Sequence, residues 1–126
     1  MIIRKAVLSD APGIAKVRVD TWRTAYNNII SAAHLQKLSY EKITQQFAAV
    51  LADNNNIVYV AEVEPGEIIG FAFGGANRSK RIRFAGEIYA LYVLKEYENK
   101  GVGHLLVNAV ADAFAALNVG SMIIWV

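Results

Sequence analysis

The sequence predicts a single mixed α/β domain, and three observations carry this prediction. Runs rich in β-branched and aromatic residues alternate with stretches whose apolar residues recur at helical spacing. Two of these runs, 57–63 and 68–75, are joined by a Pro-Gly turn, which favours an antiparallel hairpin. A third run, 88–94, is followed by a glycine turn and then by a helical stretch. With 126 residues, the chain has the length of one domain with one core.

The N-terminal region predicts a strand followed by a helix. We expect the strand over residues 2–7. Ser9 or Asp10 can cap the helix, because their side chains accept the N–H groups that a first turn leaves unpaired, and Pro12 suits that first turn. The helix is expected to end near residue 26. Its apolar residues form one stripe at helical spacing: Ala11, Ala15, Val19, Trp22 and Tyr26.

The remaining elements follow from similar signals. A second helical region begins at Ser31 or Ser39 and ends at Ala52. After the hairpin and a strand over 86–94 comes the longest helix, whose apolar stripe is Val102, Leu106, Ala109, Val110, Ala113 and Leu117. The last apolar run, 121–126, predicts a final strand. The expected order is therefore β-α-α-β-β-β-α-β, a mixed sheet with helices on both faces.

Composition argues against several classes of protein. Hydrophobic residues make up 55% of the chain and charged residues 19%, which indicates a globular domain and not a disordered one. The net charge of +2 is too small for a nucleic-acid footprint, and the sequence carries no membrane span or signal peptide, so we expect a cytoplasmic protein without nucleic-acid or membrane partners. There is no cysteine, and His34 and His104 are the only histidines, which argues against disulfides, thiolate chemistry and a multi-histidine metal site.

The most informative segment is the glycine turn Glu98-Asn99-Lys100-Gly101-Val102-Gly103-His104. It lies between an apolar strand and a helix, where the first N–H groups of the helix have no intrahelical partner and the helix dipole is positive. Glycine lets the backbone come close to a phosphate. The segment lacks the third glycine of the dinucleotide fingerprint, and the chain contains no P-loop motif. A tight turn with no ligand is the alternative interpretation.

This segment resembles the pyrophosphate-binding turn of the GNAT N-acetyltransferase superfamily, which reads Gln/Arg-x-x-Gly-x-Gly/Ala after a hydrophobic strand. It fits at every position except the first, where Glu98 replaces the usual Gln or Arg. We expect the Glu98 side chain to turn to solvent; if it faces the pyrophosphate, its negative charge lowers the affinity for the coenzyme. The opening residues 2–6 and the segment 22–26 also look like bacterial members, and the resemblance extends over residues 2–126.

The resemblance implies an acetyl-CoA-dependent N-acetyltransferase and indicates its site residues. Residues 98–104 would hold the pyrophosphate, and main-chain groups of Leu91, Tyr92 and Val93 would bind the pantetheine arm and polarise the thioester carbonyl. Glu87 is the predicted catalytic base. Tyr89 lies two residues further on, shares its face unless a bulge intervenes, and would line the site or hold a water. Both residues also fit a purely structural role, as a strand-end carboxylate and a packed aromatic side chain.

The acceptor is expected at the end of the first helix, in the variable substrate region of the superfamily. Trp22 and Tyr26 are the predicted walls of an acceptor cleft, and Trp22 equally suits core packing. Arg18 lies beside the apolar stripe, where it either extends to solvent or meets a substrate carboxylate. The basic cluster at 78–83 either forms a solvated loop or attracts an anionic acceptor. The acceptor amine itself is not identified by the sequence.

The C-terminal end of the sequence sets two further expectations. Superfamily members normally continue with a helix and two strands, and that helix often carries a tyrosine that protonates the departing thiolate. We therefore expect impaired activity, and a homodimer in which the partner covers the apolar edge formed by Ser121 to Val126. The alternative function is a catalytically silent or truncated acyl-CoA-binding module. A nucleotide-binding Rossmann module is disfavoured by the antiparallel hairpin.

Overall fold

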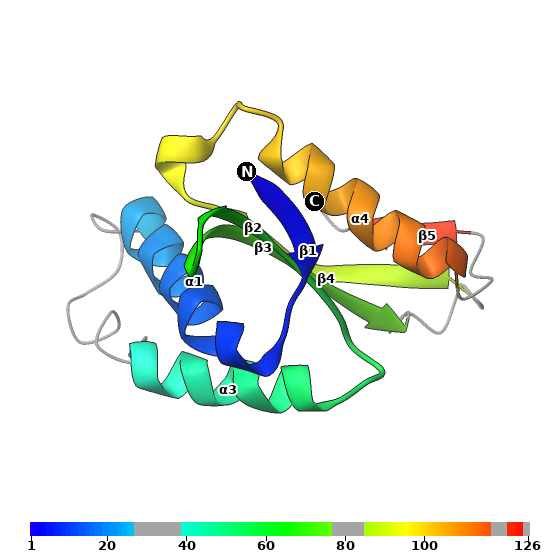
Figure 1. Ribbon diagram of the computed structural model, residues 1–126, viewed down its shortest axis with the longest axis horizontal. Coiled ribbons are helices and arrows are strands. Elements are labelled where there is room, and N and C mark those ends of the chain that lie inside the picture. The colour runs from blue at the N-terminus through cyan, green and yellow to red at the C-terminus, as the bar shows by residue number, and fades with distance from the viewer. Residues whose placement is uncertain (27–38, 77–84, 117–120, 125–126) are drawn as a thin grey trace.

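The chain forms a five-stranded mixed sheet with helices on both faces (Figure 1). The computed structural model describes residues 1–26, 39–76, 85–116 and 121–124, and of residues 25–26, 85 and 121–124 it describes the backbone alone. The elements in order are β1 (Ile2–Lys5), the 3-10 turn η1 (Leu8–Asp10), α1 (Ala11–Tyr26), α3 (Tyr40–Ala52), β2 (Ile57–Glu64), β3 (Glu67–Ala76), β4 (Ala85–Val93), the 3-10 turn η2 (Lys95–Tyr97), α4 (Val102–Ala116) and β5 (Ser121–Ile124).

The sheet topology confirms the predicted mixed α/β class and element order. The strand order is β1-β2-β3-β4-β5, with antiparallel pairing from β1 to β4 and parallel pairing of β5 with β4. The predicted hairpin joins β2 to β3. At its turn Gly66 has a φ of 82°, a left-handed value that favours glycine, and its N–H donates to Glu62 Oε2 over 2.9 Å.

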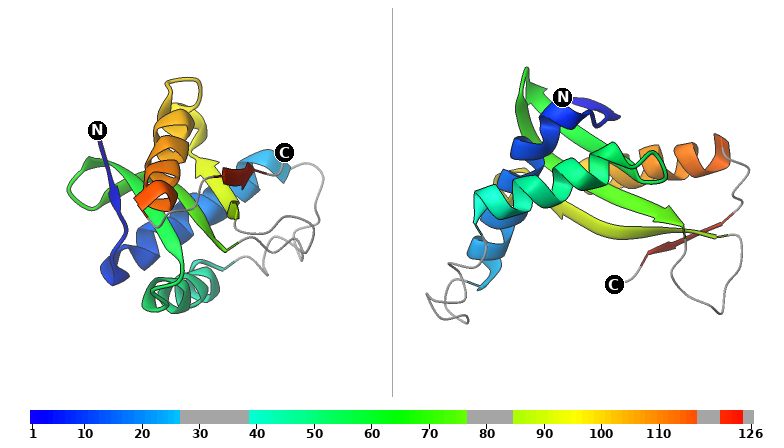
Figure 2. Two further views of the ribbon diagram at one scale, coloured as in Figure 1. Left: turned by 90° about the vertical axis from the view of Figure 1, so that its right-hand side faces the viewer. Right: turned by 90° about the horizontal axis from the view of Figure 1, so that it is seen from below.

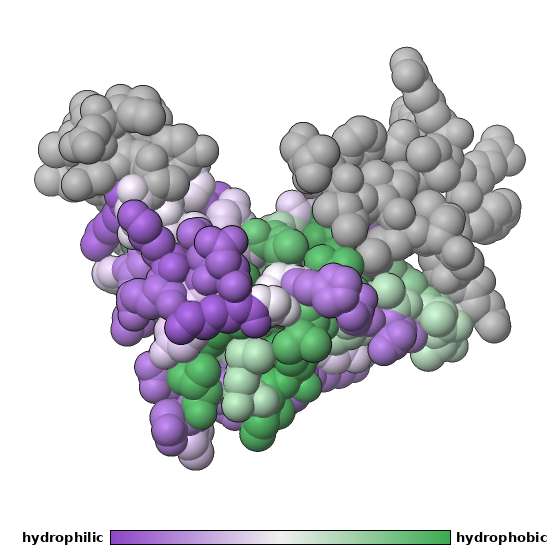
Figure 3. Space-filling view, turned by 90° about the horizontal axis from the view of Figure 1, so that it is seen from above, coloured by the Kyte–Doolittle hydropathy of each residue, from purple (hydrophilic) through white to green (hydrophobic). Residues whose placement is uncertain are grey.

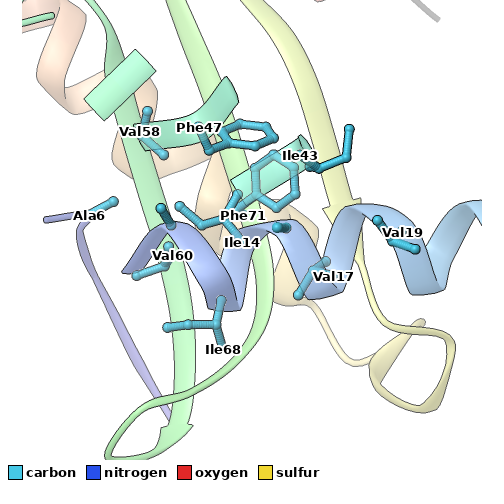
Figure 4. Close-up of a cluster of buried hydrophobic side chains, with 12 residues drawn as sticks. Ala6, Ile14, Val17, Val19, Ile43, Phe47, Val58, Val60, Ile68 and Phe71 are labelled. Atoms are coloured by element: carbon cyan, nitrogen blue, oxygen red, sulfur yellow. The ribbon is translucent and has the colours of Figure 1, made fainter. Parts of the chain in front are cut away.

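One core lies between the sheet and the pair α1 and α3 (Figure 4). Phe47 of α3 packs edge-on against Phe71 of β3, with ring centroids 5.2 Å apart. Helix α1 buries Ile14 and Val17 in addition to part of its predicted stripe. It contacts both α3 and β3, so it needs two apolar sides, and a single stripe therefore underestimates its buried surface.

A second core lies on the opposite face of the sheet, under α4 (Figure 2). The predicted stripe is confirmed at Val102, Leu106 and Val110, which are buried. It missed Phe114, which is also buried. The ring of Phe114 occupies the space above Gly86 of β4, where an added Cβ would lie 2.5 Å from ring atoms. The predicted stripe member at position 117 lies outside the described residues.

Of the predicted helix caps, Ser39 is confirmed and Asp10 has a different role. Ser39 caps α3, since its hydroxyl accepts the N–H of Lys42 over 3.1 Å. Asp10 instead serves the turn before α1: its carboxylate accepts the N–H of Val7 and forms two 2.8 Å bonds with the Arg4 guanidinium. These bonds hold the pKa of Asp10 below its ordinary value.

Candidate functional site

The candidate site is built on the edge of β4 that β5 leaves uncovered. Strand β5 pairs with β4 from Ala85 opposite Ser121 to Ile88 opposite Ile124. Beyond this point, residues 89–93 have no strand partner on that edge among the residues that the structure describes. Seen from above, hydrophobic side chains gather on part of the surface that the structure describes (Figure 3). An extended ligand can therefore pair with the backbone of β4 in place of a strand.

Alternation of the backbone shows which groups of β4 face this open edge. The N–H of Leu94 donates to Ile69 on β3 over 2.9 Å, and the carbonyl of Tyr92 points to Gly70 on the same strand. Backbone groups of successive strand residues point to opposite edges. Leu91 and Val93 therefore direct their N–H and carbonyl groups to the open edge. Three residues were predicted to bind through the main chain. The main-chain groups of one of them, Tyr92, point to β3 and not to the open edge.

A bulge interrupts β4 at Tyr89. Phe73 of β3 pairs with Ala90 and the next residue, Gly74, pairs with Ile88, so Tyr89 is the extra residue of β4. Its ring packs edge-on against Phe73, with centroids 5.1 Å apart, and its hydroxyl donates to the carbonyl of Ala76. The face that Tyr89 occupies was predicted on the condition that no such bulge is present.

Glu87 is buried, with only 1% of its surface exposed. It pairs with Gly75 of β3, and residues directly opposite each other in a sheet project from the same face. A Cβ on Gly75 would lie 3.0 Å from the hydroxyl of Tyr89, so all three positions share one face of the sheet. Glu87 and Tyr89 therefore lie on the same face in spite of the bulge. Glu87 is therefore not a solvent-exposed carboxylate at the end of a strand.

The turn before α4 forms a pocket of about 330 Å³, lined by Val93, Tyr97, Glu98, Asn99, Gly101, Val102, Gly103 and His104. Gly101 has a φ of 81°, and its carbonyl accepts the N–H of Leu105, which begins the helix. The N–H groups of residues 102–104 precede this first helical bond, and the three residues line the pocket. The turn therefore presents several donors at the positive end of α4.

Two members of the predicted turn differ from the others. Lys100 is not among the residues that line the pocket; its ammonium lies 5.6 Å from the ring centroid of Tyr97. Glu98 is exposed and lines both this pocket and a second one of about 200 Å³, together with Thr21, Thr24 and Lys95. The second pocket was not predicted, because it forms between α1 and η2, which are distant in sequence.

The acceptor region predicted on α1 does lie beside β4. Trp22 is half-buried, and the Arg18 guanidinium carbon is 5.6 Å from the Trp22 ring centroid and 4.8 Å from that of Tyr92. The side chain of Tyr26 and the basic cluster at 78–83 lie outside the described residues. Within the described ranges there is no group of three metal-ligating side chains, and none of the helices there is long and apolar enough to cross a membrane.

A sheet that opens beside β4, with a glycine turn and a pocket at the start of the following helix, is the arrangement that the resemblance to an acyltransferase predicts. The sequence pattern of the Acetyltransferase (GNAT) family matches residues 17–126. The chain belongs to this family, whose general reaction is acetyl-CoA-dependent N-acetylation.

Known relatives agree with this assignment. The chain is 36% identical over 124 residues to the uncharacterized N-acetyltransferase YuaI of Bacillus subtilis strain 168, covering 98% of this chain and 70% of YuaI. In fold it is similar to the PaiA N-acetyltransferase of Thermoplasma acidophilum in complex with coenzyme A, with a TM-score of 0.74, 21% identity, and coverage of 99% and 78% of the two chains. It is also similar to a possible acetyltransferase of Clostridium difficile 630, with a TM-score of 0.71, 22% identity, and coverage of 99% and 78%.

Proposed function

We propose that this protein transfers the acetyl group of acetyl-CoA to an amine of a small molecule or peptide by direct attack. The observation that carries the proposal is the arrangement along β4. The open backbone edge has the anion-binding pocket at one end and the buried carboxylate of Glu87 near the other. Acetyl-CoA supplies the activated acetyl group, and the chain supplies the groups that hold it and remove the proton.

The donors of the chain fit the coenzyme. The N–H groups of residues 102–104 would bind the pyrophosphate, where the dipole of α4 favours negative charge. The backbone of Leu91 and Val93 would continue the binding along the pantetheine arm, whose amides need the partners that a neighbouring strand would offer. The N–H of Leu91 would then stabilise negative charge on the thioester oxygen.

Glu87 is the proposed general base. An amine with a pKa of about 10 must lose a proton to become a nucleophile. The carboxylate of Glu87 would take this proton, directly or through a water, before the amine attacks. As the new C–N bond then forms and the C–S bond breaks, CoA would leave as a thiolate, and the second proton lost by the nitrogen would pass through water to that thiolate. Tyr89 lies on the same face and would help to position the water that takes the first proton to Glu87.

Thermal shift measurements with acetyl-CoA, CoA and NAD test the binding half of the proposal. A ligand at a hundred times its dissociation constant stabilises the folded state by about 2.7 kcal/mol. Acetyl-CoA and CoA should raise the melting temperature and NAD should not. Stabilisation by NAD alone would overturn the proposal.

Release of free thiol in the presence of an amine panel tests the catalytic half. Binding without thiol release would favour the second candidate, a silent acyl-CoA-binding module. That candidate is supported by Glu98, whose negative charge lies at the coenzyme pocket.

We also propose a homodimer that covers the edge of residues 121–126. In the described sheet, β5 is the last strand of the order, and an uncovered strand edge favours pairing with another chain. Multi-angle light scattering at increasing protein concentration should give the mass of a dimer. A constant monomer mass would reject this proposal without affecting the assignment of the coenzyme pocket.

A further inference from the structure

Two buried polar atoms on α1 have no hydrogen-bond partner in the described part of the chain, Nη1 of Arg18 and Oγ1 of Thr21. Buried polar groups in native proteins are nearly always hydrogen-bonded, because an unpaired donor has lost its water without replacement. Residues three apart lie on the same side of a helix. The two side chains therefore lie on the same side of α1, where one ligand can reach both.

The surroundings of Arg18 point to the kind of ligand. Its guanidinium carbon lies over the rings of Tyr92 and Trp22, at 4.8 and 5.6 Å from their centroids. Stacking engages the face of the guanidinium and leaves its in-plane N–H donors for another group. These donors form a planar fork that matches the two oxygens of a carboxylate.

The position of these atoms is on the acceptor side of the open edge. Tyr92 belongs to the segment of β4 that has β3 on one edge and, among the described residues, no strand on the other, and Thr21 lines the pocket of about 200 Å³. This pocket meets the coenzyme pocket at Glu98, and Lys95 adds a second positive charge to it. A ligand held here lies next to the place proposed for the thioester.

We propose that Arg18 and Thr21 bind a carboxylate of the acceptor, so that the substrate class is amines that also carry a carboxylate. The inference rests on the proposed function. The Arg18 fork pairs with the carboxylate, the Thr21 hydroxyl donates to it, and the amine end of the acceptor extends along β4 toward Glu87. The competing occupant of these donors is a carbonyl oxygen of the pantetheine arm.

The fluorescence of Trp22 provides a direct test, because Arg18 lies over its ring. The chain contains two tryptophans, so in the Trp125→Phe variant all tryptophan fluorescence comes from Trp22. This variant, saturated with CoA, is titrated with amines that differ only in a carboxylate: L-lysine against cadaverine, L-leucine against isoamylamine, and L-histidine against histamine. At least one carboxylated amine should bind at least ten times more tightly than its counterpart.

Variants of α1 give the matched controls. Thr21→Val removes the hydroxyl at nearly constant volume and should weaken binding of the carboxylated amine five- to tenfold, whereas Thr21→Ser should stay within twofold of the parent. Arg18→Gln should abolish the discrimination between the paired amines. The CoA dissociation constant and the melting temperature of each variant are measured in parallel to show that the fold and the coenzyme pocket are intact.

The outcomes separate the two proposals. Equal binding of the paired amines, or no response to any carboxylated amine, would overturn the carboxylate site while normal CoA binding upheld the coenzyme assignment. A loss of CoA affinity in Arg18→Gln and Thr21→Val, without discrimination between amines, would assign these donors to the pantetheine arm. Absence of CoA binding in the parent protein would instead reject the proposed function.

Discussion

Two turns of this protein have a glycine in the left-handed region and differ in what they do with their backbone. Gly66, with a φ of 82°, joins β2 to β3, and Gly101, with a φ of 81°, precedes α4. At both positions an added Cβ would have no atom within 4 Å. In the hairpin turn the N–H of Gly66 is bonded to Glu62. In the other turn residues 102–104, whose N–H groups precede the first helical hydrogen bond, line a pocket.

The difference shows that the element after a glycine turn matters more than the glycine. A strand that follows a turn uses its backbone groups in the ladder with its neighbour. A helix leaves its first N–H groups without internal partners and adds a positive dipole end. The same local conformation therefore reverses the chain in one place and begins a helix beside a pocket in the other.

The largest expected effect is the contrast between Gly101→Val and Gly66→Val. Both variants place a β-branched side chain at a left-handed position, and each should lose about 1–2 kcal/mol of unfolding free energy. Only Gly101→Val should abolish measurable CoA binding, because its side chain enters the coenzyme pocket. Isothermal titration with CoA and urea unfolding measure the two quantities. Equal CoA affinity in the two variants would contradict the assignment of the turn.

Variants at Glu87 should separate coenzyme binding from catalysis. Glu87→Gln should lower kcat by about 10² or more, as expected on loss of a general base, and leave the CoA dissociation constant unchanged. Steady-state kinetics across pH and CoA titration check both parts. Tyr89→Phe is the parallel variant on the same face and should have the smaller effect. Full turnover of Glu87→Gln at every pH would remove this residue from the mechanism.

Acid should weaken the hairpin side of the molecule. Arg4 bonds lower the pKa of Asp10 and, together with the Gly66 N–H, that of Glu62, from ordinary values of 3.8 and 4.5. A carboxylate with a lowered folded-state pKa stabilises the fold above its unfolded-state pKa, and this contribution is lost as the pH falls through the folded value. Urea unfolding between pH 6 and 3 should show falling stability. Asp10→Asn should show a shallower decline, and an unchanged profile would contradict the role of this pair.

The smallest expected effect concerns Glu98. Removing its charge with Glu98→Gln should tighten CoA binding by roughly two- to fivefold at low salt, and the gain should shrink as salt screens an exposed charge. Titration at two ionic strengths measures this. A carboxylate that points away from the pyrophosphate gives a neutral result. Weaker binding of CoA by Glu98→Gln would contradict both orientations.

Signals from neighbouring residues were sufficient to predict most of the fold and the glycine turn before α4. The hairpin follows from the Pro-Gly turn, and the pocket before α4 follows from an apolar strand, two glycines and an apolar helix. Helical periodicity found Val102, Leu106 and Val110, because these residues repeat along one face. Such signals depend on neighbours in sequence, which is why they succeed here.

Contacts between distant elements could not be predicted in the same way. Phe114 was missed because its space is created by Gly86, on another element. The stacking of Arg18 on Tyr92 depends on how α1 lies over the sheet, and the bulge at Tyr89 depends on its register with β3. The sequence therefore could not decide whether Arg18 extends to solvent or meets a substrate carboxylate. No pattern in the sequence indicated the second pocket.

The packing of Phe114 over Gly86 fixes the position of α4 relative to β4. The helix has 15 residues, a length of about 22 Å. Its first turn borders the coenzyme pocket, and Phe114, near its other end, is seated on the residue that precedes Glu87. Because Phe114 is seated on Gly86, a methyl group at position 86 would tilt α4. Under the proposed function, this packing would set the spacing between the bound diphosphate and the base. The proposed acceptor region on α1 packs on the other face of the sheet, so it would be free to change while that spacing is kept.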